Sequence, residues 1–248
     1  MAATGRAIQT QGATDETVQR PEEAAASLAC LAQDLARTTD PAQVARGMAA
    51  GRKLATPEVV ETLLETAAKP LSDLKAVAGA LRFRGAAVVG AVLGRLNDAE
   101  DRGKRRAYFQ LATALAAFPD LHDSLVGSLE AALYDRRWEV VRNAIALLAA
   151  IGLPLPAESH YDLSTSPHVQ VRLAFTQVLA RGKPSADALA LLCALIGDEH
   201  PGVRLAAAVG LRAYRHPRAR QALEQCAARE TDAETKAVCL GALKANPG

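Results

Sequence analysis

A helical sequence pattern returns several times along this 248-residue chain. Residues 135–152 read as a polar turn, then an amphipathic segment with an arginine about one helical turn in, then a glycine. The same order of residue types recurs in 164–182 and 198–214. If the basic residue marks the phase of each copy, the steps are 36, 30, 32 and 32 residues, the markers being Arg106, Arg142, Arg172, Arg204 and Lys236. A repeat of this length predicts a solenoid of stacked helix pairs.

The composition favours helices over strands. Half of the residues are hydrophobic but only 4% are aromatic, and alanine and leucine supply most of the apolar content. Such a mixture suits helices better than sheets, which are enriched in β-branched and aromatic residues. We therefore predict an all-α fold, a right-handed α-α superhelix of about six or seven helix pairs.

Three regions are predicted along this solenoid. Residues 1–20 are polar and show no periodicity, which predicts a disordered N-terminal tail. Residues 21–84 are predicted to be atypical helical repeats, because they share the helix spacing but lack the Val-Arg signature, as end repeats often do. Residues 85–248 carry the regular repeats and continue the same solenoid. Their predicted helix pairs are 86–96 with 102–118, 120–133 with 136–151, 156–163 with 167–181, 184–196 with 200–215, and 217–229 with 231–245.

Charge, cysteines and hydropathy point to a soluble cytoplasmic protein. The formal net charge of +2 neither requires nor excludes nucleic acid. The four cysteines form no Cys-x-x-Cys motif, and free buried thiols at Cys193 and Cys239 would fit a reducing compartment. We expect no signal peptide and no membrane helix, because the longest uncharged runs fall short of the ~18 residues that a span needs.

The repeated blocks resemble a known family. Each combines Val-Arg with a small or apolar residue further along the helix, and two begin with aspartate: Asp135 with Val141-Arg142, Val171-Arg172, and Asp198 with Val203-Arg204. This pattern resembles HEAT repeats, in particular the bacterial HEAT-like repeats of the phycobilin-lyase type. The resemblance covers about residues 85–245 well and 21–84 weakly. It implies a HEAT-like α-solenoid that holds protein partners on a curved surface, with the second helix of each pair lining the concave side.

Regularly spaced arginines are the first candidate site. We predict a structural ladder in which each arginine binds the aspartate of the preceding turn or exposed carbonyls of a neighbouring helix end, its members being Asp135, Arg142, Arg172, Asp198 and Arg204. The alternative is that equally spaced cations follow the phosphates of a nucleic acid.

The inter-helix turns are the second candidate. Basic residues cluster at Arg105 and Arg106, and at Arg136 and Arg137 in the next copy. Three interpretations remain open: a solvated face, a surface for an acidic protein, or a nucleic-acid contact. Trp138, the single tryptophan, follows the second cluster. It is predicted either to pack between repeats or to anchor a partner, so these five residues form the candidate partner-binding set.

Catalysis finds little support in the sequence. The five histidines show no His-x-x-x-His or His-Glu spacing, as a metal site on a helix would need. No Gly-rich phosphate loop and no Gly-x-Ser-x-Gly motif occurs. We therefore expect no catalytic residues, no cofactor and no metal. The prediction is a non-enzymatic scaffold for protein partners; the alternatives are a nucleic-acid-binding HEAT module and, third, a HEAT enzyme of the lyase or glycosylase type.

Overall fold

The computed structural model describes residues 20–245 of the chain. The predicted disordered tail, residues 1–20, lies outside this range apart from Arg20. The described residues form fourteen α-helices and two short 3-10 helices, with no strand among them. This arrangement confirms the prediction of an all-α solenoid.

The helices are short and regularly spaced. The N-terminal group is α1 (Pro21–Arg37), α2 (Pro41–Leu54), α3 (Pro57–Ala67) and α4 (Leu74–Leu81), ending in the 3-10 helix η1 (Arg82–Arg84). The central group is α5 (Ala87–Asp98), α6 (Arg102–Leu115), α7 (Pro119–Ala132) and α8 (Trp138–Ala150). The C-terminal group is η2 (Ala157–Ser159), α9 (His160–Ser164), α10 (Val169–Arg181), α11 (Ala186–Leu195), α12 (Pro201–Leu211), α13 (Pro217–Arg229) and α14 (Ala233–Ala245).

Local signals fix where most of these helices begin. Six of them start with proline, whose missing N–H would be unpaired in the first turn anyway. Side-chain caps satisfy other free N–H groups: Asp101 accepts from the N–H of Lys104 at 2.8 Å before α6, and Ser185 accepts from that of Ala188 at 3.1 Å before α11. Prolines and caps therefore divide the chain into helices without help from distant contacts.

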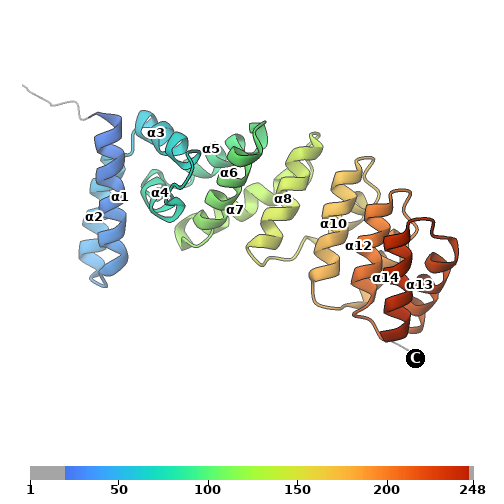
Figure 1. Cartoon of the computed structure of the whole chain (residues 1–248). Coiled ribbons are helices and arrows are strands. Elements are labelled where there is room, and N and C mark those ends of the chain that lie inside the picture. The colour runs from blue at the N-terminus through green and yellow to red at the C-terminus, as the bar shows by residue number, and fades with distance from the viewer. Residues whose placement is uncertain (1–19, 246–248) are drawn as a thin grey trace, which may run out of the picture.

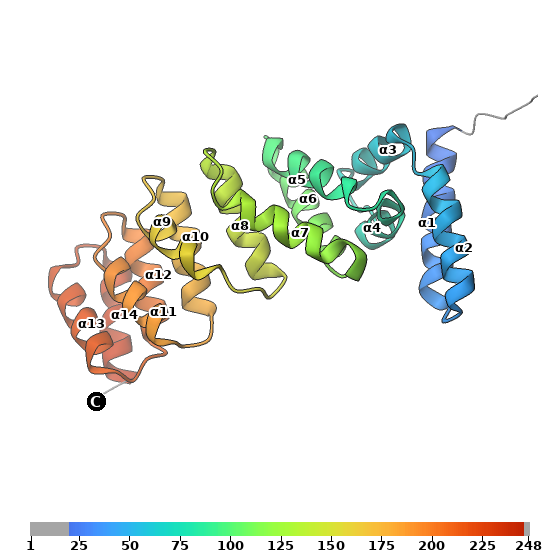
Figure 2. The same cartoon turned by 180° about the vertical axis from the view of Figure 1, so that it is seen from behind.

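The helices build two layers (Figures 1 and 2). From α4 onward the second helices of the pairs pack one on the next: α4, α6, α8, α10, α12 and α14. The first helices lie behind them, visible in the reverse view as α5, α7, α9, α11 and α13. Buried leucines between the layers, such as Leu111, Leu148 and Leu211, form one continuous core strip. The result is an extended array in which each helix contacts only near neighbours in sequence order.

The connection between α8 and α10 interrupts this regularity. Gly152 ends α8 with a positive φ of 79°, and the N–H of Leu153 donates to the carbonyl of Leu148 at 2.9 Å, as in a Schellman C-cap. The first helix of this pair is reduced to η2 and the five-residue α9, because the prolines at 154 and 156 prevent a longer helix there. Leu155 and Leu163 are nevertheless buried, so the core strip continues across the break.

Candidate functional site

In three repeats, the fourth residue of the pair's second helix is an arginine that binds the turn before that helix. In α6, α10 and α12 this residue is Arg105, Arg172 and Arg204. Each guanidinium donates to a backbone carbonyl six residues earlier in the chain, at 2.7 Å for Arg105 to Ala99, 2.8 Å for Arg172 to Ser166 and 3.0 Å for Arg204 to Asp198. These carbonyls lie in the turn, where no helical N–H is available to them.

Two of these arginines also bind a carboxylate of the following repeat. Arg172 donates to Asp198 with Nε at 2.7 Å and Nη2 at 3.0 Å, and Arg204 donates to Glu230 with Nε at 2.6 Å and Nη2 at 2.8 Å. Both contacts have the bidentate geometry that suits a planar guanidinium and a carboxylate. The pairing differs from the predicted one: the preceding turn supplies a carbonyl, and the turn of the next repeat supplies the acid. Stacked repeats place that next turn directly beside the arginine.

Both pairs are shielded from solvent. Arg172 is 7% exposed, and the side chain of Glu230 is 2% exposed. The hydrogen bond from Arg204 outweighs the effect of burial and lowers the pKa of Glu230 from 4.5 to about 2. The hydrogen bond that Arg172 donates to Asp198 raises the pKa of Arg172. The Glu230 carboxylate is therefore held ionised at neutral pH.

The predicted ladder fails at α8. The fourth residue of α8 is Val141, which is buried, and Arg142 lies one residue further along the helix. Asp135, the predicted partner of Arg142, instead accepts from the backbone N–H of Arg137 at 2.7 Å. The marker Arg106 was likewise one residue late: it is exposed, and Arg105 makes the contact to the turn. Arginine spacing alone did not reveal this shift of one residue.

Arg142 has a different environment from the paired arginines. Its Nη2 donates to the side-chain oxygen of Asn143 at 2.8 Å, and Asn143 donates in turn to Asn97 of α5 at 2.9 Å. Its guanidinium carbon lies 5.3 Å from the centre of the Trp138 ring. Among residues 20–245, no carboxylate lies within ion-pairing distance of it.

Electrostatics single out this arginine as well. Burial lowers the pKa of Arg142, and the nearby charge of Arg105 lowers it further, while Glu139 acts in the opposite direction. Guanidinium groups stay protonated at physiological pH in any case. The lowered pKa therefore describes a cation that is partly desolvated and has a second cation nearby.

Trp138 packs between repeats, which is one of the two roles that the sequence left open, while its role as a partner anchor stays a prediction. Its side chain is half-buried and packs against the core. Its ring also stacks on His168, which precedes α10, with 6.2 Å between ring centres and 26° between ring planes. The ring thus bridges α8 and the turn before α10 while part of it stays accessible.

The remaining predicted residues lie in the exposed turns. Arg136 and Arg137 are both exposed. Arg137 bridges two turns, since its Nη1 donates to Asp98 at 3.2 Å. The turn before α8 therefore lies beside the C-terminal end of α5, with acids interleaved among the cations.

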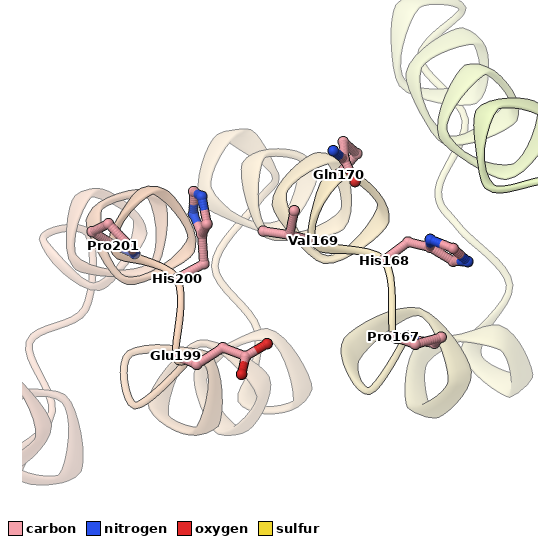
Figure 3. Close-up of a pocket in the computed structure, with 7 residues that line it drawn as sticks. All are labelled: Pro167, His168, Val169, Gln170, Glu199, His200 and Pro201. Atoms are coloured by element: carbon pink, nitrogen blue, oxygen red, sulfur yellow. The ribbon is translucent and has the colours of Figure 1, made fainter.

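A shallow pocket of about 500 Å³ lies between the turns before α10 and α12 (Figure 3). Its lining includes His168 and His200, each next to a proline. Two of its polar groups are engaged within the chain: the Nδ1 atom of His200 accepts from the N–H of Gly202 at 3.1 Å, and Glu199 accepts from Arg172 at 2.9 Å. Sequence reasoning missed this pocket, although the repeated His and Pro residues before successive helices were the available signal.

Two further properties concern only the described part of the chain. Residues 20–245 contain no group of three His, Cys, Asp or Glu side chains placed to hold a metal ion. None of their helices combines the length and the apolar character that crossing a membrane requires.

Fold and contacts together define a protein class, the α-solenoids built of stacked helix pairs. A comparison with protein-family models matches residues 161–244 to HEAT repeats. This segment, which is similar to HEAT repeats, contains both arginine–carboxylate pairs. A comparison with curated proteins gives no match.

Similar solved structures include the following two, and the first of them supports the fold. The complex of CpcE and CpcF of phycocyanin lyase from Nostoc sp. PCC7120 is 19% identical, with a TM-score of 0.52, over 63% of this chain and 98% of that chain. Computationally designed armadillo repeat proteins for modular peptide recognition are 17% identical, with a TM-score of 0.48, over 88% of this chain and 99% of theirs. At 19% identity, the first of these similarities is evidence for the fold alone.

Proposed function

We propose that this protein is a non-enzymatic scaffold that binds protein partners along its layer of second helices. The observation that supports this most is the continuous row of second helices from α4 to α14, each packed on the next along the array (Figure 1). Two large apolar residues of the C-terminal repeats are exposed on this layer, Val209 of α12 at 44% and Leu240 of α14 at 45%. Open solenoid surfaces of this kind suit extended partners.

Two further observations support a protein partner. The solved structure of CpcE and CpcF is itself a complex of two proteins. In the present chain, acids accompany the cations of the turns, and Asp98 pairs with Arg137. Interleaved acids weaken the attraction of these turns for a phosphate backbone.

Affinity purification of the tagged full chain from the lysate of its own cells, with and without nuclease, tests the proposal. We expect a defined protein partner that survives nuclease treatment and moderate salt. The double variant Val209→Glu, Leu240→Glu should lose this partner, because charges on exposed apolar positions disturb binding more than folding. Tyr161→Glu is the control on the other layer, since Tyr161 lies on α9 and is 74% exposed.

Two outcomes would contradict the proposal. Capture of nucleic acid alone, or loss of all partners on nuclease treatment, would favour the nucleic-acid-binding alternative. A partner lost from Tyr161→Glu and retained by the double variant would place binding on the first-helix layer.

A further inference from the structure

Repeats within this chain show what a partly buried arginine binds here. Arg172 and Arg204 each engage a carboxylate in bidentate geometry. Arg142 is half-buried as well, but its described hydrogen bond goes to the neutral amide of Asn143. A desolvated cation without a counter-ion is costly unless another group approaches it.

The free donors of Arg142 are accessible. A guanidinium carries five N–H donors, and one hydrogen bond from it to Asn143 is described. No buried side-chain polar atom of the described residues lacks a partner, so the unbonded N–H groups of Arg142 are within reach of solvent. They are therefore within reach of a ligand too.

Nearby groups favour an anion at this position. The charge of Arg105 lies close enough to lower the pKa of Arg142. The guanidinium of Arg105 is itself bound to carbonyls. Its charge is therefore not compensated by any ion pair among residues 20–245. Glu139 is the opposing charge on α8. In a partly desolvated site these charges act more strongly than they would in bulk water.

Trp138 gives the site a fixed wall. Arg142 packs over its ring and His168 stacks on it, so the indole contacts both α8 and the turn before α10. A half-exposed tryptophan beside an arginine is the pair of residue types most enriched among binding hot spots.

We propose that Arg142 and Trp138 form a docking site for an aspartate or glutamate side chain presented by an extended segment of a protein partner. The proposal rests on the scaffold function above and names the chemistry of the partner. The same chain already uses carboxylates as the ligands of two other partly buried arginines, Arg172 and Arg204. A nucleic acid is disfavoured because Asp98, Glu100 and Asp101 lie in the turn before α6, beside the cations.

Trp138, as the only tryptophan, reports on the site directly. The full-length protein is titrated with a capped hexaglutamate peptide and, separately, with capped hexaglutamine. Intrinsic fluorescence and the anisotropy of fluorescein-labelled peptide are both followed. We expect the glutamate peptide to change Trp138 emission and to bind with half-saturation at or below about 1 mM, a modest affinity for a site of this size. Hexaglutamine should not bind.

Variants separate this site from general surface charge. Arg142→Met should weaken binding roughly 10-fold or more, the effect of losing one charge-assisted hydrogen bond. The affinity of Arg142→Lys should lie between those of Arg142→Met and the natural protein, because lysine keeps the charge but lacks the paired N–H donors of a guanidinium. Arg181→Met is the control: it removes an exposed arginine at the end of α10 and should change affinity less than about 2-fold. Circular dichroism confirms that each variant is folded.

Several results would overturn the inference. They are equal binding of the two peptides, no effect of Arg142→Met, preference for a single-stranded DNA oligomer over hexaglutamate, or self-association of the chain that Arg142→Met abolishes. If Arg142→Met still captures every lysate partner and hexaglutamate does not bind, this inference fails while the scaffold function stands. If no partner survives nuclease, the scaffold function itself fails.

Discussion

Replacing Glu230 with glutamine tests how much an arginine–carboxylate pair stabilises the stacking of repeats. The substitution keeps the size of the side chain and one acceptor oxygen but removes the charge that Arg204 binds at 2.6 and 2.8 Å. It also weakens the bonds that Glu230 accepts from the N–H groups of Thr231 and Asp232, both at 3.0 Å. The perturbation therefore affects the junction of α12 with α14 and leaves the apolar core unchanged.

The expected magnitude follows from the pKa of Glu230. This pKa is lowered from 4.5 to about 2 in the folded protein, and each pKa unit corresponds to about 1.4 kcal/mol. The ionised carboxylate thus contributes about 3 kcal/mol to the free energy of unfolding at neutral pH. Because the folded-state pKa is the lower one, this contribution is complete above about pH 4.5 and is lost as the pH falls through about 2.

Urea unfolding followed by circular dichroism, at pH 7 and at steps down to pH 2, measures the difference between the natural protein and Glu230→Gln. We expect a gap of about 3 kcal/mol at pH 7 that closes on acidification, because a protonated glutamate resembles glutamine. Glu224→Gln is the control, since Glu224 forms an exposed pair with Arg220 on the same helix and should cost less than about 0.5 kcal/mol. A gap below about 1 kcal/mol at pH 7, or one that does not change with pH, would refute this reasoning.

Three further predictions concern packing and thiol chemistry. Arg172→Ala should lower the free energy of unfolding by about 1 to 3 kcal/mol, because it leaves buried hydrogen-bonding groups without a partner; an unchanged melting temperature would contradict this. Gly210→Ala should also destabilise, by about 1 to 3 kcal/mol, since an added Cβ would lie 2.9 Å from the backbone of α10. At Gly94 an added Cβ would have nothing within 4 Å, so Gly94→Ala should instead stabilise α5 by up to about 1 kcal/mol. If the two variants changed the melting temperature in the same direction, the packing argument would be refuted. Burial raises the pKa of Cys239 to about 12. Iodoacetamide at pH 8 should therefore modify the exposed Cys30 and spare Cys239. Comparable modification of both cysteines, measured by mass spectrometry, would contradict the burial of Cys239.

Most helix boundaries could be predicted because their causes are local. The predicted helix 217–229 coincides with α13 (Pro217–Arg229), which follows a histidine cap and begins with proline. The shortened connection after α8 was likewise predictable from Gly152 and the two prolines that follow it. Caps, prolines and glycines act on the backbone within a few residues, so they can be read without knowing the fold.

The candidate site depended on information of another kind. The run Val140-Val141-Arg142 fits the repeat in two registers one residue apart, and only packing selected the one that buries both valines. The sequence by itself determined the helices, their pairing and the stacking of the pairs, because the hydrophobic period and the helix stops are local. The tertiary structure decided which carboxylate Arg172 and Arg204 bind, because these partners come from the next repeat. It also decided that Arg142 binds no carboxylate among the described residues, because a shift of one residue turns a helical side chain by about 100°.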